Sequence, residues 1–468
     1  MSAPQRVTNV VVNTYGLANL GFSLMVSMTS NYYAFFLTDV LLMPAAVMAT
    51  LMMVLNLFDM LTVPTAGVIM QKSNLPWGKN RSWMLIGPPI TLITFTLIFT
   101  NPPLEGVFRY LWIIIIYTIA HGSYNLSFGA LSAILPILGK TPEDRAILSI
   151  RRLQFSSISR FIFGAISMPM LLFFTARGAT VPAVRGYTFT SLVLSSVMLT
   201  MFWLVFKVTE PYETRNNSQS AAQQKKSNIS GKEMLQQLFK SPPLLALIFG
   251  ETARNVAAFA LTYTIAYYFR YIIQNMSLMP VFMSSIAVIG VVASLLVQLV
   301  SKYMDKRHIY TAGLVLCLVG HTLAYLFARD LITFIIFMGI NQVGVSFMMG
   351  ISFAMFSDCC DYGELKTGKV ATPFIMNLTN LSPKLGKIVS SGVIGFSLAA
   401  IGYVAEMEYT PQLAANIRAI IHLVPMLFIA VALVITTLFN KLTIETVLNM
   451  QNQLRANREA DSASQAGV

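Results

Sequence analysis

The chain has 468 residues, of which 55% are hydrophobic and only 11% are charged, whereas soluble globular proteins carry about 25% charged residues. This composition excludes an ordinary soluble domain, and apolar stretches of about 20 residues along the whole length predict an all-α membrane protein that crosses the bilayer many times. The formal net charge of +13 would suit a nucleic-acid-binding protein, but the positions of the basic residues argue against nucleic acid as a partner.

Twelve transmembrane helices are predicted in chain order. They cover residues 10–37, 42–70, 82–100, 110–138, 153–175, 186–206, 241–273, 277–300, 309–328, 331–357, 373–405 and 411–440. An even number of spans places both termini on one side, and the loops of that side hold most of the 32 Lys and Arg. The opposite loops hold Arg109, Arg177, Arg185, Arg270 and Arg329. Because basic loops stay in the cytoplasm, both termini are predicted to be cytoplasmic, in a plasma membrane and, with short outer loops, in the inner membrane of a bacterium.

A polar stretch separates the first six spans from the last six. Its Ser, Gln, Asn and Lys composition is typical of a flexible linker. The predicted domains are an N-terminal six-helix bundle at 1–208, a cytoplasmic linker at 209–240, a C-terminal six-helix bundle at 241–440 and a cytoplasmic tail at 441–468. Two such halves are typical of transporters built from repeats, whose substrate site lies near the midplane between them.

The second span contains an acidic residue, Asp59, in the stretch "VLNLFDMLTVPTAG". An ionisable residue inside the bilayer is costly and marks a functional site by default. The alternative is a structural partner for a nearby basic residue. The three intramembrane histidines, His121, His321 and His422, lack the spacing of a metal site, so neither a metal nor another cofactor is expected.

A cluster of charge ends the tenth span, in the stretch "FSDCCDYGELKTGKVAT". Asp358, Asp361 and Glu364 are spaced three residues apart and form one stripe on a helix. Carboxylates at a helix C-terminus oppose the helix dipole and need cationic partners, which Lys366 and cytoplasmic loop residues such as Arg145 supply. The cluster is predicted to be an ion-pair lock that closes the cytoplasmic face; the alternative is a solvated helix end.

The stretch "AMFSDCCDYGELKTGK" resembles the tenth-helix signature of the glycoside–pentoside–hexuronide:cation symporters, a branch of the major facilitator superfamily that includes the melibiose permease. The segments "NYYAFFLTDVLLMP", "WGKNRSWMLIGPP", "AILPILGKTPEDRAILSIRR" and "PKLGKIVSSGVIGFSLAAIGY" are similar to other parts of the same family. The resemblance covers nearly the whole chain. It implies two six-helix bundles around a cavity that opens to each side in turn.

The resemblance gives Asp59 the position of the first cation-binding Asp of the melibiose permease. The second Asp of that family is replaced here by Val63, and the Asn between them by Thr62. Sodium prefers several oxygen ligands, so a single carboxylate and a hydroxyl favour a proton over sodium as the coupling ion. Lys384 matches the helix-11 lysine of the family, between the cation and sugar sites, and is expected to face Asp59.

The sugar-binding carboxylates of the melibiose permease have no counterpart at the matching positions of this chain. Asn19 and Ser23 stand at the helix-1 positions, Phe128 at the helix-4 carboxylate, and Ser132 at the sugar-stacking Trp. Arg152 matches the family's helix-5 arginine at the cavity. The substrate is therefore either not a galactoside or held differently.

The charges within the spans are mainly basic. Glu251 and Arg254 are three residues apart and are predicted to pair with each other. Apart from this pair, the charge within the spans is net positive. Because a charged pore lining opposes its substrate in sign, the expected substrate is an anionic sugar derivative such as a hexuronide or a sulfonated sugar. In the alternative, the other basic residues of the spans reach the cytoplasmic rim and form part of the ion-pair lock.

The sequence therefore predicts a secondary active sugar transporter, not an enzyme, that works as a monomer by alternating access with proton-coupled symport. Two alternatives stay open. One is an uncoupled facilitator or a transporter-like sensor, since coupling carboxylates are missing. The other is a lysolipid carrier, since several polar cavity positions have become Phe or Val.

Overall fold

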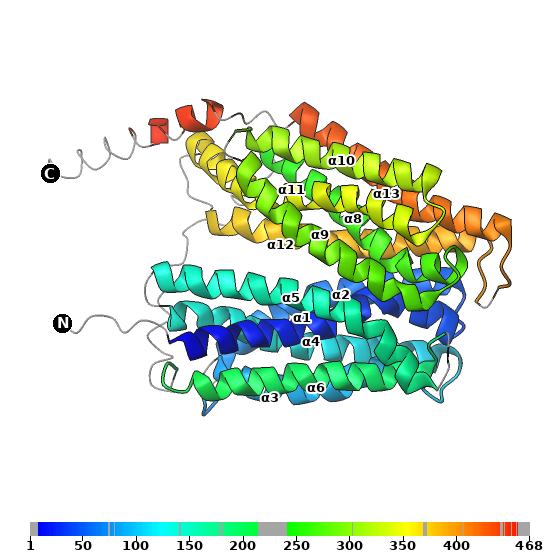
Figure 1. Cartoon of the computed structure of the whole chain (residues 1–468). Coiled ribbons are helices and arrows are strands. Elements are labelled where there is room, and N and C mark those ends of the chain that lie inside the picture. The colour runs from blue at the N-terminus through cyan, green and yellow to red at the C-terminus, as the bar shows by residue number, and fades with distance from the viewer. Residues whose placement is uncertain are drawn as a thin grey trace. The chain divides into compact units, whose positions relative to one another are not determined.

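The computed structural model describes residues 8–73, 75–78, 80–139, 142–176, 179, 181–213, 241–301, 303–367, 372–405, 407–439, 443, 445–450, 452–454 and 456. Throughout this described part the chain is helical and contains no strand. The long helices are α1 (Asn9–Phe35), α2 (Ala45–Lys72), α3 (Arg81–Ile98), α4 (Gly106–Leu138), α5 (Pro142–Thr175), α6 (Val184–Val208), α8 (Pro242–Tyr271), α9 (Met279–Val300), α10 (Lys306–Phe327), α11 (Leu331–Thr367), α12 (Thr372–Ala400) and α13 (Pro411–Phe439) (Figure 1).

Each predicted span coincides with one of these helices. In the described residues, eleven helices are long and apolar enough to cross a membrane. The remaining long helix, α12, contains Lys384 and Lys387. A helix is the form that such a segment must take in lipid, because it satisfies every backbone hydrogen bond internally. The predicted all-α membrane fold is confirmed.

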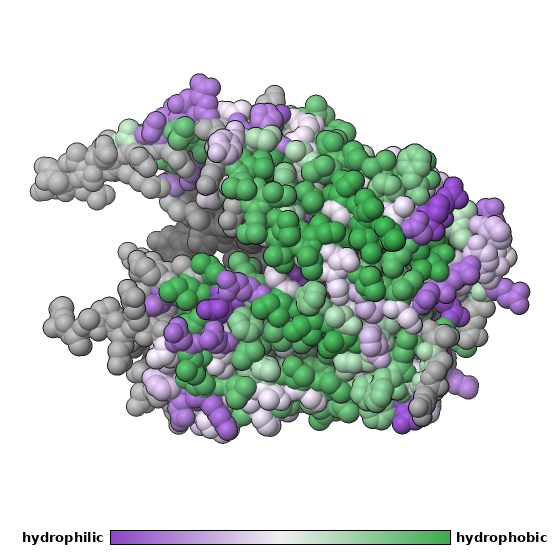
Figure 2. Space-filling view, viewed as in Figure 1, coloured by the Kyte–Doolittle hydropathy of each residue, from purple (hydrophilic) through white to green (hydrophobic). Residues whose placement is uncertain are grey.

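The surfaces of the helices fit a lipid environment. Large apolar side chains such as Leu295, Ile332 and Leu427 are more than half exposed. On the visible face, apolar residues gather along the flanks of the helices and hydrophilic residues toward their ends (Figure 2). Apolar exposure on this scale is typical of a surface that contacts acyl chains rather than water.

The described helices fall into two compact units. The first comprises the described residues of Met1–Gln224, Thr262–Ala287 and Ser391–Ile417, and the second those of Lys225–Leu261, Val288–Ser390 and Arg418–Val468. Four helices, α8, α9, α12 and α13, therefore contribute one end to each unit. The predicted domain boundaries at 208, 240 and 440 describe a different division and stay a prediction.

In the first unit, α1 packs against α5 and α6, and α3 packs against α4 and α6 (Figure 1). The turn between α2 and α3 is closed by Glu213, whose carboxylate accepts hydrogen bonds from the backbone N–H groups of Asn80 (3.2 Å) and Arg81 (3.0 Å). The guanidinium of Arg81 donates in return to the backbone carbonyl of Glu213 (3.2 Å). These bonds satisfy N–H groups that the first turn of α3 leaves without helical partners.

The end of α1 widens into a π-helical turn, η1 (Phe36–Val40). The Leu41 N–H donates to the carbonyl of Phe36, five residues back (2.9 Å), and Leu42 follows with a φ of 57°. Single π turns occur often at functional sites because they redirect side chains. Thr38 and Asp39 lie within this turn.

Candidate functional site

Asp59 lies inside the first unit, with 1% of its surface exposed. Its Oδ1 accepts a hydrogen bond from Asn125 Nδ2 (3.0 Å) and lies 3.0 Å from Nδ1 of His121. The same Nδ1 is 2.6 Å from the hydroxyl of Tyr124. The carboxylate from α2 therefore meets an amide, an imidazole and a phenol from α4.

Thr62, the other residue expected in cation coupling, belongs to the same cluster. Its hydroxyl donates to the backbone carbonyl of Asp59 (2.8 Å) and accepts from Asn125 Nδ2 (2.8 Å). One amide of α4 thus bridges the two residues that the sequence singled out on α2. His121 and Asn125 are four residues apart, so both point from the same face of α4.

The sequence interpretation missed the contact of His121 with Asp59, because it asked only whether the histidines had metal-ligand spacing. The imidazole is buried and stacks on the ring of Tyr117 with centroids 3.7 Å apart. Its Nδ1 can donate to an ionised Asp59 or accept from a protonated one, so the contact holds in both protonation states. A signal was present in the sequence: a histidine four residues from an asparagine, within an apolar span.

A second cluster, on α1, α4 and α5 of the same unit, contains Arg152. Its guanidinium carbon lies 4.7 Å from the centroid of the Phe128 ring, and its Nε donates to Oδ1 of Asn19 (3.3 Å). Asn19 Nδ2 donates in turn to the backbone carbonyl of Arg152 (3.1 Å). Among the described residues, no carboxylate forms an ion pair with Arg152.

The rings beside Arg152 connect the two clusters. Phe22 stacks on Phe128 with centroids 4.2 Å apart, and it forms a T-shaped pair with Tyr124 at 5.5 Å. Of the predicted substrate residues, the structure brings Asn19, Phe128 and Arg152 together. Ser23 and Ser132 stand one turn from Asn19 and Phe128 on α1 and α4, and both are half-buried.

Lys384 belongs to the second unit, on α12, and is half-buried. Asp59 belongs to the first unit, so the expectation that Lys384 faces Asp59 stays a prediction. Lys387, one turn further, places its Nζ 5.4 Å from the centroid of Phe259 on α8.

The predicted cytoplasmic lock lies at the end of α11 in the second unit. Both oxygens of Asp358 accept from Nζ of Lys306 at 2.8 Å, so this carboxylate has a cationic partner within its own unit. Asp361 and Glu364 are half-buried on the same helix, and Lys366 Nζ lies 5.9 Å from the Tyr362 ring. The side chain of Arg145 lies outside the described residues. A lock that joins the two halves stays a prediction.

The predicted pairing of Glu251 with Arg254 is confirmed. Arg254 Nη2 donates to Glu251 Oε2 (2.8 Å), and the hydroxyl of Tyr310 donates to Oε1 (2.7 Å). All three side chains are buried in the second unit. Because each ion has a partner, the cluster has the character of a structural ion pair.

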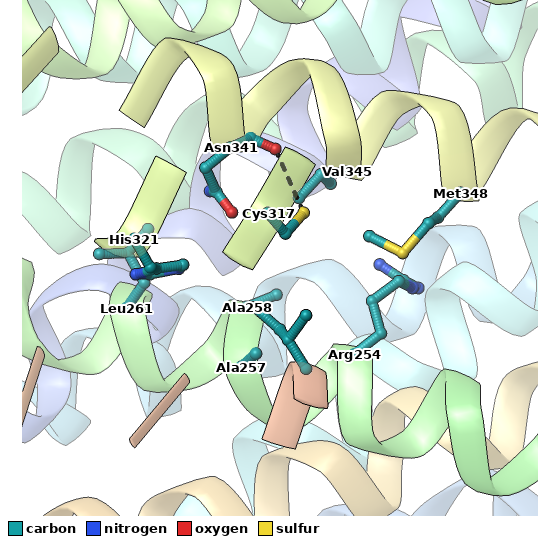
Figure 3. Close-up of a pocket in the computed structure, with 10 residues that line it drawn as sticks. Arg254, Ala257, Ala258, Leu261, Cys317, His321, Asn341, Val345 and Met348 are labelled. Atoms are coloured by element: carbon teal, nitrogen blue, oxygen red, sulfur yellow. Dashed lines mark hydrogen bonds between the residues drawn. The ribbon is translucent and has the colours of Figure 1, made fainter. Parts of the chain in front are cut away.

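A cavity of about 20 Å³ lies beside this pair. Figure 3 shows Arg254 at one end and His321 at the other, with Cys317 and Asn341 joined by a hydrogen bond of 3.4 Å. A single water requires about 10–15 Å³, so the cavity has room for a water and none for a sugar. In the described part of the chain, no group of three or more His, Cys, Asp and Glu is placed to hold a metal ion.

Comparison with known proteins identifies the family. The family model described as "MFS/sugar transport protein" matches residues 14–442. The isoprimeverose transporter of Lactiplantibacillus pentosus is 25% identical, over 85% of this chain and 82% of that protein. The glucuronide carrier protein homolog of Escherichia coli (strain K12) is 24% identical, over 95% and 96%.

Among solved structures, the nucleoside transporter NupG has the same fold. Its TM-score is 0.60 at 13% sequence identity, over 92% of this chain and 98% of that one. These findings confirm the resemblance to the glycoside–pentoside–hexuronide symporters. The chain belongs to the MFS/sugar transport protein family and is a multi-pass membrane transporter, not an enzyme, with the major facilitator fold.

Proposed function

We propose that this protein imports a sugar or glycoside by symport with protons, in the inner membrane of a bacterium, with both termini in the cytoplasm. The observation that carries the proposal is the 3.0 Å contact between His121 Nδ1 and Asp59 Oδ1. The pair has a net charge of −1 when it holds no extra proton and 0 when it holds one. Since burial penalises uncompensated charge, loading one proton favours the buried form of the site.

The same contact disfavours sodium. A sodium ion prefers a shell of oxygen atoms, and here one side of the carboxylate is occupied by an imidazole nitrogen. Val63 stands one turn from Asp59 and adds no oxygen ligand. Asn125 and Thr62 supply two oxygens, but the Asn125 amide directs its NH₂ group at both Asp59 and Thr62. These donors face the carboxylate where sodium would need oxygen ligands, whereas the imidazole of His121 can take up a proton.

The proposed substrate carries an anionic group that Arg152 binds. Arg152 is half-buried, stacks on Phe128 and forms no ion pair with a described carboxylate. A guanidinium recognises carboxylate and sulfonate groups in bidentate geometry, and the stacked Phe128 and Phe22 rings give its surroundings an apolar side. The similarity to a glucuronide carrier homolog supports a hexuronide; the similarity to an isoprimeverose transporter supports a neutral disaccharide.

Uptake into proteoliposomes tests both parts. A glucuronide, a sulfonated hexose and isoprimeverose are offered in turn, with a pH gradient and a sodium gradient applied separately. We expect accumulation of an anionic sugar under the pH gradient alone. Accumulation driven only by sodium contradicts proton coupling, uptake without accumulation indicates a facilitator, and binding without exchange indicates a sensor. Movement of a lysophospholipid without any sugar would identify a lipid carrier.

A further inference from the structure

A network of hydroxyl groups surrounds Asp39 at the end of α1. Oδ1 of Asp39 accepts hydrogen bonds from the hydroxyls of Tyr403 (2.7 Å) and Tyr271 (3.2 Å), and Oδ2 accepts from Thr38 (2.7 Å). The Thr38 hydroxyl also contacts the hydroxyl of Tyr267 (2.6 Å). Three of these partners, Tyr267, Tyr271 and Tyr403, come from the end of α8 and the segment after α12, far away in the sequence and within the first unit.

Next to this network, α12 packs on α2 with backbone in contact. A Cβ added to Gly395 would lie 2.2 Å from Cβ and 2.6 Å from Cα of Ala49, and one added to Gly392 would lie 2.5 Å from Sδ of Met53. Only glycine fits at position 395, because a side chain there would overlap backbone atoms of Ala49. One turn before Gly395 on α12, the hydroxyl of Ser391 accepts a hydrogen bond from Asn56 Nδ2 (3.3 Å).

The contact runs along one face of α2 toward the Asp59 site. Ala49, Met53 and Asn56 are three or four residues apart, and Asp59 follows three residues later, so all four lie on adjoining parts of one helix face. Tyr263 of α8 is hydrogen-bonded to Asn56 and interacts electrostatically with Asp59. The same two helix ends that cover Asp39 therefore also reach the site at Asp59.

We propose that these contacts form one latch, made of Asp39 with Tyr267, Tyr271 and Tyr403, together with Gly392 and Gly395 where they pack on α2. The latch closes the substrate site toward the end of the bundle where α1 finishes, and it must open when the transporter takes up or releases substrate on that side. The inference rests on the proposed transport function.

Two physical features suit this cluster to reversible opening. Asp39 stands at the end of a span, where its carboxylate exchanges the hydroxyl donors of Tyr271 and Tyr403 for water when the segments separate and keeps its bond from Thr38, so neither state leaves a buried carboxylate without partners. The glycine contact is held by close van der Waals packing, which is lost as a whole over a small separation. Both features favour two discrete arrangements over a gradual one.

Cysteine accessibility tests the latch. The reporter is Ser27→Cys on α1, one turn from Ser23, in a chain whose cysteines Cys317, Cys359 and Cys360 are replaced by alanine. A membrane-impermeant maleimide is added to right-side-out and to inverted vesicles. We expect Asp39→Ala and Tyr403→Phe to raise the labelling rate from the side opposite the N-terminus about tenfold, the change that loss of a hydrogen bond to a charged group predicts.

Gly395→Leu provides an independent variant, because it forces α12 away from Ala49 without touching Asp39. It should raise labelling from the same side. Asp330→Ala is the matched control: this carboxylate also accepts several hydrogen bonds, all from its own turn at Ile332 and Thr333, and labelling should not change. Unchanged labelling in Asp39→Ala and Gly395→Leu, with both variants still reconstituted and folded, would overturn the latch.

The latch and the transport function can fail separately. Normal accumulation of sugar with unchanged labelling in every variant rejects the latch and leaves the function intact. Altered labelling in a protein that transports none of the sugars rejects the function and leaves the latch.

Discussion

His121 Nδ1 lies 3.0 Å from Asp59 Oδ1, and the two residues come from different helices, 62 positions apart in the chain. An acid and a base at this distance can share one proton, and their net charge then depends on whether the proton is present. The pair is therefore a coupling site only if both members contribute to proton binding. The sequence alone had pointed to a single carboxylate.

Replacement of Asp59 by Asn removes the carboxylate and keeps its shape. We expect accumulation of sugar under a pH gradient to disappear, while exchange of labelled for unlabelled sugar continues, because an amide takes up no proton at neutral pH.

His121→Asn should shift the midpoint of the pH profile of uptake by about one unit or more, since a hydrogen bond to a charged group is worth about 1.5–3 kcal/mol. His308→Asn, at an exposed position, serves as control; an unchanged profile in His121→Asn would assign the proton to Asp59 alone.

Arg152 is predicted to decide between charged and neutral substrates. Arg152→Gln should weaken binding of an anionic sugar about 10- to 100-fold, from the loss of about 1.5–3 kcal/mol of charged hydrogen bonding. Binding of the neutral sugar of the same ring structure should change little. Arg152→Lys should recover part of the loss, because lysine keeps the charge without the bidentate geometry. Binding is measured by calorimetry; equal losses for both sugars would assign Arg152 to the packing of α5 on Asn19 and Phe128.

The sequence predicted what depends on short stretches of chain. Hydropathy and length located the spans, since each helix in lipid must satisfy its own backbone. The spacing of three residues predicted the contact of Glu251 with Arg254. The cationic partner of Asp358 was expected among loop residues, and the structure identifies it as Lys306, 52 positions away.

Other features could not be predicted, because they depend on which helices meet. His121 contacts Asp59 only because α4 lies against α2. Tyr271 and Tyr403 reach Asp39 across more than 200 residues of chain. The π-helical turn at Phe36–Val40, which contains Asp39, has no signal in the periodicity of apolar residues.

Glu213 is predicted to stabilise the start of α3. Its carboxylate accepts from two backbone N–H groups and from Asn80 Nδ2 (3.0 Å). Glu213→Ala should lower the free energy of unfolding by about 1–3 kcal/mol, the cost of leaving buried donors unsatisfied. Thermal unfolding in detergent measures the loss. Glu210→Ala, at an exposed position nearby, should have little effect, and a similar loss in both variants would indicate a general effect of charge.

The pair of Glu251 and Arg254 provides a sharper test, because the double substitution should restore most of the stability that the single substitution removes. Glu251→Gln leaves the guanidinium of Arg254 buried without a counter-charge, and we expect the free energy of unfolding to fall by about 3–5 kcal/mol. The double variant Glu251→Gln with Arg254→Met removes both charges and should recover most of this stability. Tyr310, which donates to Glu251 at 2.7 Å, can still donate to the amide of Gln.

Thermal unfolding of the two single variants and the double variant gives the coupling energy of the pair. Sugar uptake by the double variant then separates structure from function. Uptake close to the original rate assigns the pair to stability, as its burial and mutual contacts indicate. A double variant that is stable but inactive would instead place Arg254, at the edge of the cavity that also contacts His321, among the residues that transport requires.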